Sequence, residues 1–490
     1  MAARPVKIPA PLGGWNTRDP VSAMQPTDAI VLENMVVDTN GVTVRPGYTQ
    51  YVDHSGDYVN SLIQWKTQFG ERFLSADKTG SNHRLFDITT GTASSIKAGY
   101  VRSTWDYAVF NGSLGLVNGG DNPQKLDYSP GPGVTVRDMA VTGPSDPSDL
   151  AVIHAHKERS YFATKEEPAF WYSEVESLGG TLNKFPIDRV SLTGGNVIEL
   201  STWSRDGGSG PDDFLVVFLD TGEVLVYQGS DPSDATDWAI VGRYSLGAVR
   251  AVTEFAGKIH VVTEEDYVVV PDDLISEGLR KPTKLSGAAR DAVRKYGGDF
   301  QIFIDPASGL RIVNIPSTSR QQHILNLRTG GASRWTIPSN VWGRFRGDLY
   351  FGGTDGKVYK IVDNTDDAGT AVAWSAQQAF TDLGTPANKS VPTYRPVWTK
   401  SGTFKFDSGL AFDFNSRDFI QTITTSSDGS PWDTSPWDTS SWSGDNPTKM
   451  DWLMGAGRGQ SISILQNGTA TRSATWHHTD FRIEVGRDIL

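Results

Sequence analysis

Histidine pairs are the side chains of this sequence whose type and spacing most readily suggest chemistry. His154 and His156 fall on one face of a predicted strand, with Glu158 nearby, and two imidazoles with a carboxylate could begin a metal site. No complete set of ligands accompanies them, so a structural role is the alternative that we favour. His477 and His478 would project to opposite faces of their strand, which argues against shared ligation.

An acidic, glycine-rich stretch from Asp206 to Asp213 is a second candidate. Its carboxylates, Asp206, Asp212 and Asp213, could bind calcium together with backbone carbonyl groups, but their spacing is not that of an EF-hand. A solvated turn is the alternative. Ser204–Gly208, which overlaps this stretch, resembles the start of the Asp-box turn of sialidase-type propellers, although Pro211 stands where that turn has an aromatic residue.

Three tryptophans, Trp432, Trp437 and Trp442, recur every five residues in a segment that also contains prolines and aspartates. Exposed indole rings beside aspartates can stack on sugar rings. Alternatively, the tryptophans hold this segment against its own domain or against a neighbouring subunit. We favour the subunit contact, because the prolines keep the segment out of a core strand.

Strong catalytic signatures are absent from the sequence. It contains no phosphate-binding Gly-x-x-x-x-Gly-Lys-Ser/Thr loop, no His-Glu-x-x-His and no Gly-x-Ser-x-Gly. Gly455 to Gly459 is rich in glycine but lacks the strand–turn–helix context of a dinucleotide site. We therefore predict that the protein is not an enzyme, and we assign no catalytic, cofactor-binding or metal-binding residue.

The stretch from Phe345 to Ile361 indicates the architecture that would position these candidates. Two β-branched and aromatic runs flank Asp355-Gly356, a pair suited to a tight hairpin turn. Similar pairs of runs precede it: Arg72–Ala76 with Arg84–Ile88, Tyr107–Val117 with Leu126–Tyr128, Arg159–Thr164 with Ala169–Val175, Phe214–Leu219 with Glu223–Tyr227, Phe255–Val262 with Tyr267–Val270, and Phe300–Ile304 with Leu310–Ile315. Their spacing of roughly 40 to 58 residues is typical of propeller blades, and predicts six or seven of them.

This pattern predicts an all-β chain that is divided into three regions. Residues 1–50 are predicted to be an extended N-terminal segment with a short helical turn over 28–33, capped by Thr27. Residues 51–370 form the β-propeller, interrupted by one helix over 288–295 that Ser286 caps and Gly297-Gly298 ends. Because this helix falls between blades, we expect it to be a surface insertion. Residues 371–490 form a separate β-domain similar to a sandwich, in which Phe404, Phe406, Leu410, Phe412 and Phe414 share a buried face. Its candidate strands include Ala474–His478 and Phe481–Val485.

Composition restricts the function further. The 490 residues carry a formal net charge of −12, which argues against a broad basic surface that grips nucleic acid. Cysteine is absent, so no disulfide and no zinc–thiolate site is expected. We also expect no signal peptide and no membrane anchor, because no apolar run approaches the necessary length.

Several segments together resemble the tail-tube or nozzle proteins of short-tailed, double-stranded-DNA bacteriophages. They are Gly13–Pro20, Met24, Asp28-Ala29, Leu32-Glu33-Asn34, Arg45-Pro46-Gly47-Tyr48, Phe170-Trp171-Tyr172, Trp203–Gly208, Gly222-Glu223-Val224, Tyr227–Pro232, Trp238 and Leu349–Tyr359. The resemblance covers most of residues 13–400 and becomes weak in the C-terminal domain. These segments are structural landmarks, so no catalytic residue follows from them.

The resemblance implies a structural virion protein, assembled in the host cytoplasm into a homo-oligomeric ring of six subunits in the phage tail. Its partners would be the tail adaptor or head–tail connector, the tail fibres or tailspikes, and the genomic duplex that passes through the ring. We expect the narrowest part of the lumen to carry more Asp and Glu than Lys and Arg, since a basic wall would retain DNA. Two alternatives are a carbohydrate-binding or glycan-degrading propeller and a scaffold for protein partners.

Overall fold

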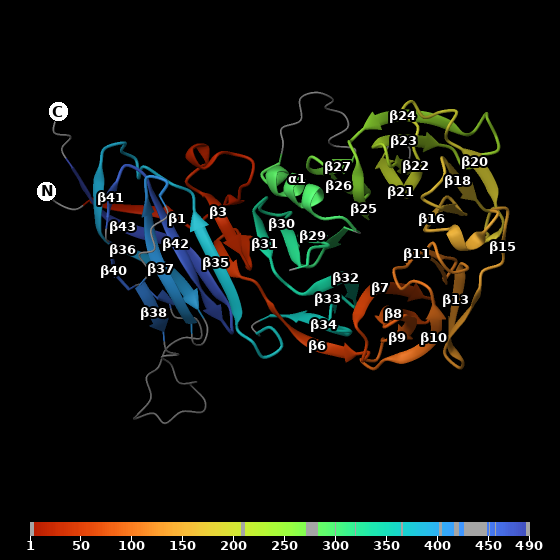
Figure 1. The fold of residues 1–490 in the computed structure, drawn as a ribbon, viewed down its shortest axis with the longest axis horizontal. Helices are drawn as coiled ribbons and strands as arrows, with labels where there is room; N and C mark the ends of the chain where they lie inside the picture. Colours follow the sequence, from red (N-terminus) through yellow and green to blue (C-terminus); the bar gives the residue numbers. More distant parts are fainter. Residues whose placement is uncertain are drawn as a thin grey trace.

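Antiparallel sheets arranged around a common axis make up most of the chain (Figure 1). The computed structural model describes residues 4–206, 211–270, 283–298, 300–318, 320–363, 366–400, 404–415, 421–425, 448–449, 451–455 and 457–486. Within a blade, successive strands pair with their neighbours in the chain, because short turns join them. The predicted all-β fold with a β-propeller is confirmed.

Six separate sheets of the described residues are blades, and strands β28–β31, at one end of a larger sheet, form one more blade, which is the sixth along the chain. The first three blades are β7 (Tyr58–Thr67), β8 (Gly70–Thr79), β9 (Asn82–Asp87) and β10 (Ser94–Tyr100); β11 (Asp106–Phe110), β12 (Ser113–Val117), β13 (Gln124–Ser129) and β14 (Gly133–Asp138); and β16 (Val152–His156), β17 (Arg159–Ala163), β18 (Ala169–Tyr172) and β20 (Asn183–Pro186). The next three are β21 (Val197–Asp206), β22 (Pro211–Leu219), β23 (Glu223–Gln228) and β24 (Ala239–Ser245); β25 (Val249–Phe255), β26 (Lys258–Thr263) and β27 (Tyr267–Val270); and β28 (Gln301–Asp305), β29 (Leu310–Ile315), β30 (Gln321–Asn326) and β31 (Ala332–Trp335). The seventh is β32 (Ser339–Phe345), β33 (Asp348–Gly353), β34 (Lys357–Val362) and β6 (Gly47–Asp53).

The first strand of each blade lies at the axis and contacts the first strands of both neighbouring blades. The run from Tyr107 to Val117 is two strands, because Asn111-Gly112 turns the chain between β11 and β12. Asp355-Gly356 turns between β33 and β34 as predicted. Gly356 has a φ of 73° and a Cβ there would approach the Gly56 carbonyl oxygen to 2.1 Å, so the turn requires glycine.

Strand β6 closes the ring from the N-terminal side of the chain. It pairs antiparallel with β34, with Tyr48 opposite Ile361 and Val52 opposite Val358, and becomes the outermost strand of the last blade. The chain then passes directly into β7 of the first blade. The first and last blades are therefore joined by a strand that lies about 300 residues from its partner in sequence.

The second domain consists of two facing sheets and lies beside the propeller (Figure 1). One sheet contains β1 (Arg4–Pro9), β4 (Met35–Asp38), β5 (Gly41–Val44), β36 (Lys389–Lys400), β39 (Thr448–Lys449), β40 (Leu453–Met454), β41 (Arg458–Gly459) and β43 (Ala474–Val485). The other contains β2 (Gly14–Trp15), β3 (Asp28–Glu33), β35 (Val372–Gln378), β37 (Phe404–Phe412), β38 (Gln421–Thr425) and β42 (Ile462–Ala470), and continues into β28–β31. Trp374, Trp398 and Trp476 are buried between the two faces, as expected for a sandwich.

Two details of the sandwich differ from the sequence-based expectation. Phe414 was predicted on the buried face with Phe412, but it follows the end of β37 in a turn, has a φ of 62° and is 50% exposed. The runs predicted as two strands, 474–478 and 481–485, form the single long strand β43.

The N-terminal segment is built into both sheets of the sandwich. Strands β1 and β5 pair with β43, and β3 pairs with β35. The helical turn predicted over 28–33 is wrong, because these residues form β3. Ala29 and Leu32 are buried in the sandwich core, and pairing with a distant strand overrides the local capping signal of Thr27.

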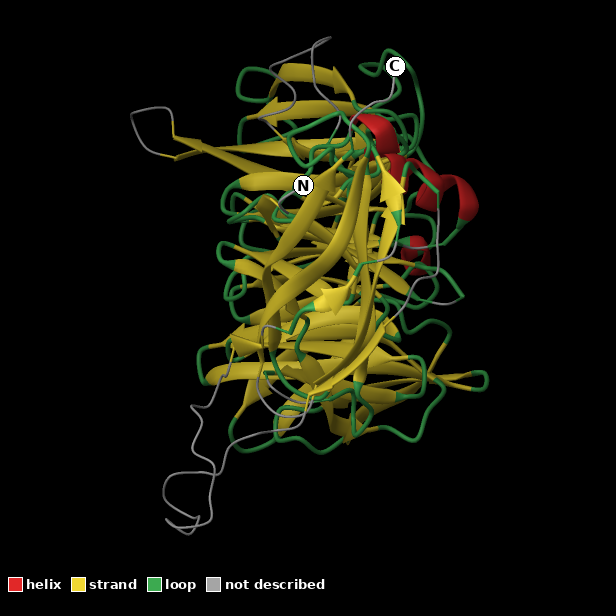
Figure 2. Cartoon of the chain, turned by 90° about the vertical axis from the view of Figure 1, so that its left-hand side faces the viewer, coloured by secondary structure: helices red, strands yellow, loops and turns green. Residues whose placement is uncertain are grey.

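The predicted helix is present as α1 (Ser286–Lys295), which begins after Leu285, with no side-chain cap from Ser286. It is not a surface insertion, because Ala288, Ala289 and Ala292 are buried against blades five and six. The remaining short elements are η1 (Val21–Ala23), η2 (Pro147–Asp149), and the parallel pair β15 (Val141–Thr142) and β19 (Gly180–Thr181). Figure 2 shows the helical segments on one side of the strands. None of the described helices is long and apolar enough to cross a membrane.

Candidate functional site at the junction of propeller and sandwich

A single sheet runs from blade six of the propeller into the sandwich. Strand β31, the last strand of that blade, pairs in parallel with β3 where Glu33 lies opposite Arg334. The side chains of the same two residues form an ion pair. Trp335, the next residue of β31, donates from Nε1 to the Met35 carbonyl oxygen at 3.0 Å. Backbone, charge and indole contacts therefore fix the two domains to each other within a few residues.

Asn34 is the centre of this junction. Its φ of 55° is unusual for a residue other than glycine, but asparagine tolerates it better than most. Nδ2 donates to Thr336 Oγ1 and to the Ala373 carbonyl oxygen, both at 2.8 Å. Oδ1 accepts from the Thr336 backbone N–H and from Arg45 Nε, both at 3.0 Å. One buried amide thus uses both donors and both acceptor positions to join the propeller, the N-terminal strands and the sandwich.

Arg45 extends the network to the loop after the last blade. Its guanidinium donates to both carboxylate oxygens of Asp367, at 2.8 and 2.6 Å, and its side chain is only 2% exposed. A two-bond pair of this kind fixes orientation as well as charge. Next along the chain, Tyr48 packs edge-on against Phe351 and Tyr359, and burial raises the pKa of Tyr48 to about 12.

A second buried polar group joins the N-terminal segment to helix α1. Asp28 is 1% exposed; it accepts from Asn16 Nδ2 at 2.8 Å and from Lys284 Nζ at 2.6 Å. Thr17 Oγ1 donates to the Lys284 carbonyl oxygen at 3.0 Å and accepts from the Ala288 N–H. Thr17 therefore supplies the cap at the start of α1 that Ser286 does not.

These contacts come from residues in segments that carry the resemblance stated above. Asn16, Asp28, Glu33, Asn34 and Arg45 all lie at the junction, although they are spread over 30 residues of sequence. The sequence marked them as landmarks but did not indicate their common location. Their partners Lys284, Arg334 and Asp367 were not singled out, because a single charged residue carries no local signal of a distant partner.

His154 and His156 join neighbouring blades at the axis. His154 Nε2 lies 2.7 Å and His156 Nδ1 2.9 Å from Thr202 Oγ1, so both imidazoles share one hydroxyl of the next inner strand. Burial holds the pKa of His154 below its usual value, against the opposing charge of Glu254, and lowers that of His156 to about 3. Neutral rings suit this arrangement, because one ring donates to the hydroxyl and the other accepts from it. Glu158 lies in the following turn with a φ of 62°.

The same kind of contact recurs around the axis. Glu254 of β25 accepts from Ser201 Oγ of β21 at 2.7 Å, and Asp106 of β11 accepts from the Ile153 N–H of β16 at 2.8 Å. Gln301 of β28 exchanges two hydrogen bonds with the backbone of Trp342 on β32. Polar side chains of the inner strands therefore join successive blades near the axis.

Two acidic side chains in this inner region have a pKa above the usual value. Burial raises the pKa of Glu199 to about 8, and the nearby charge of Asp106 adds to the rise. Burial also raises the pKa of Asp106. Sequence reasoning did not single out either residue, because each stands alone in its strand.

The remaining sequence candidates are not brought together. Within the described part of the chain, no three His, Asp or Glu side chains are placed to hold a metal ion. Asp206, Asp212 and Asp213 are in the β21–β22 hairpin, where Asp212 lies opposite Arg205 and Asp213 opposite Ser204 in the strand register. Residues 207–210 lie outside the described residues. Trp432, Trp437 and Trp442 also lie outside the described residues.

The glycine-rich run and the second histidine pair belong to the sandwich. Arg458 and Gly459 form β41 at the edge of β36, and a Cβ at Gly457 would meet the Phe412 ring at 2.3 Å, so close packing explains that glycine. His477 contacts Thr399 Oγ1 and the Asn40 carbonyl oxygen, both at 2.8 Å, whereas His478 approaches Asp480.

Comparisons with known proteins find only distant structural similarity among the matches described below. No protein-family model matches the sequence, and no curated protein is similar to it. The N-terminal part of BBS1 in complex with ARL6 is 10% identical with a TM-score of 0.42, and the match covers 66% of this chain and all of that one. YCF48 from Cyanidioschyzon merolae is 12% identical with a TM-score of 0.41, covering 64% and 98% of the two chains. BamB from Moraxella catarrhalis is 12% identical with a TM-score of 0.37, covering 66% and 92%.

Proposed function

We propose that this protein is a structural virion protein, one subunit of a ring of six in the tail tube or nozzle of a short-tailed bacteriophage. The ring would retain packaged double-stranded DNA and then let it pass during ejection. In this role the chain needs a rigid shape and complementary surfaces, and it needs no catalytic residue. The proposal extends to the phage tail as location and to the tail adaptor, the fibres or tailspikes and the genome as partners.

The observation that carries the proposal is the junction. The N-terminal residues that resemble the phage family, Asn16, Asp28, Glu33, Asn34 and Arg45, meet there and bind the propeller to the sandwich through buried polar contacts. Residues with this role set the relative orientation of two domains. A ring in which each subunit must meet its neighbours at a fixed angle depends on such an orientation.

The direct test is the assembly state of the purified protein. Six copies of a 53.4 kDa chain have a mass of about 320 kDa, which mass photometry separates readily from a monomer, and negative-stain images would show closed rings. Mass spectrometry of purified phage particles should find the protein among the tail components. A protein that stays monomeric over a wide concentration range and is absent from particles removes the proposal.

A further inference from the structure

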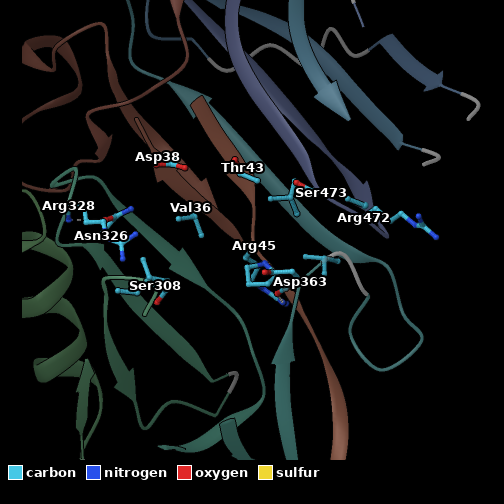
Figure 3. A pocket seen from close by; sticks show the side chains of 15 residues that line it. Val36, Asp38, Thr43, Arg45, Ser308, Asn326, Arg328, Asp363, Arg472 and Ser473 are labelled. Carbon is cyan, nitrogen blue, oxygen red and sulfur yellow. Dashed lines mark hydrogen bonds between the residues drawn. The ribbon is translucent and has the colours of Figure 1, made fainter. Parts of the chain in front are cut away.

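A groove of about 450 Å³ opens where the N-terminal strands, blade six and the sandwich meet (Figure 3). Its lining has an aliphatic part, formed by Val36 and Val44 from β4 and β5, Leu310 from blade six, and Val372 and Ala470 from the sandwich. The other lining residues are mostly polar or charged, among them Thr43, Ser308, Asn326 and Ser473. The groove is therefore shaped by the same three parts of the chain that the junction fixes together. A surface built from three rigidly joined parts is already ordered before anything binds to it.

Charged groups lie around this lining. Arg328 and Arg472 come from the propeller and the sandwich and are drawn at opposite ends of the groove. Neither has a described carboxylate within ion-pair distance, whereas Arg45 is already paired with Asp367. Two aspartates also line the groove, and Asp38 accepts from the Thr39 N–H at 2.7 Å; Asp363 is exposed. An occupant must therefore place its carboxylates at the two ends, near the arginines.

The sequence of this chain contains a segment with that chemistry. Residues 426–447 contain three tryptophans and four aspartates, and no lysine, arginine or histidine. Pro431-Trp432-Asp433-Thr434-Ser435 is followed by Pro436-Trp437-Asp438-Thr439-Ser440, so two carboxylates flank one indole. In an extended chain, the two carboxylates are up to about 17 Å apart. Tryptophan and arginine are also the side chains that contribute most to protein interfaces.

We propose that this groove binds the segment 426–447 of a neighbouring copy of the same chain. Trp437 lies against the aliphatic lining, and Asp433 and Asp438 pair with the arginines at the two ends. The contact is between different surfaces of the two copies, so repetition around an axis closes a ring. The inference rests on the proposed ring function and specifies one contact that would hold the ring together.

Two variants separate the two sides of the contact. Trp432→Ala/Trp437→Ala/Trp442→Ala changes the segment and leaves the groove intact, whereas Arg328→Glu/Arg472→Glu changes the groove and leaves the segment intact. Each alone should self-associate at least roughly 30-fold more weakly than the wild type, because each removes central anchors. The same charge reversal at Arg137 and Arg294, which are exposed and outside the groove, should leave association unchanged. Unchanged thermal melting checks that every variant is folded.

Mixing the two variants is the decisive measurement. One has an intact groove and the other an intact segment, so an equimolar mixture can form a single good contact and should give a heterodimer by analytical ultracentrifugation. Docking of the segment in its own chain would give no new species on mixing, and would overturn the proposal. The proposal is also overturned if each variant, measured by itself, associates as strongly as the wild type. That result would not contradict the proposed ring. If the mixed variants form a heterodimer but the wild-type protein forms no ring, the proposed ring is wrong and the proposed contact is supported.

Discussion

At the residue scale, the buried ion pair of Arg45 with Asp367 should contribute more to stability than an exposed ion pair does. The Arg45 side chain is 2% exposed, so removing the carboxylate leaves a buried positive charge without an opposing charge. Asp367→Asn should lower the free energy of unfolding by about 3 kcal/mol. The control is Glu264→Gln, which removes the exposed pair with Arg250 and should cost less than about 1 kcal/mol. Urea unfolding followed by tryptophan fluorescence measures both, and equal costs would contradict the expectation.

His156 gives the stability a defined pH dependence. In the folded protein its pKa is about 3, because burial disfavours the charged ring, whereas the unfolded chain takes up this proton below about pH 6.5. The unfolded state therefore binds more protons between these values. The contribution of His156 is complete above pH 6.5 and falls by about 1.4 kcal/mol for each pH unit below it. The stability difference between the wild type and His156→Asn should shrink by that amount per unit, and a constant difference would argue against it.

At the element scale, Asn34 tests whether the junction joins the two domains. Asn34→Ala removes four side-chain hydrogen bonds and places alanine at a positive φ. Asn111→Ala has the same backbone cost, since Asn111 has a φ of 49°, but Asn111 is exposed in a hairpin turn. We expect Asn34→Ala to cost about 3 kcal/mol more than Asn111→Ala, from buried groups left without partners.

Calorimetry distinguishes lost stability from lost coupling. If Asn34 joins the domains, its alanine variant should show separate transitions for the propeller and the sandwich, and new protease cleavage between 362 and 372. The Asn111 variant should keep the pattern of the wild type. A single, uniformly lowered transition for Asn34→Ala would mean that other contacts are sufficient to couple the domains.

The elements that the sequence predicted are those with local partners. The hairpin at Asp355-Gly356 and helix α1 were predictable because turn residues and apolar spacing lie within a few residues of each other. Strand β3 was predicted as a helix because its partner β35 lies more than 340 residues away. Likewise, nothing near His154 or His156 in sequence indicates that Thr202 is the partner of both. Local signals therefore gave the blades, and long-range pairing decided the junction.

At the scale of the whole molecule, charge constrains what the proposed ring can do with DNA. Each chain has a formal net charge of −12, and a ring multiplies this charge. Assembled rings should therefore show no tight binding to a DNA duplex at physiological salt, and the narrowest lumen should carry more Asp and Glu than Lys and Arg. Fluorescence anisotropy with a labelled duplex at two salt concentrations measures the first. Submicromolar, salt-sensitive binding, or a lumen lined by Arg and Lys in the assembled ring, would contradict the prediction.

The pairing of β6 with β34 in the propeller and of β1 with β43 in the sandwich has a consequence for biosynthesis. Strand β6 is made early but waits for β34, which is translated some 300 residues later, and β1 waits for β43, which ends at Val485. Translation must therefore pass β43 before all of the first strands can find their places. Chains with such distant contacts fold slowly. We expect polypeptides truncated before β43 to leave β1 unprotected in hydrogen exchange, and polypeptides that include β43 to gain that protection only after β43 has left the ribosome.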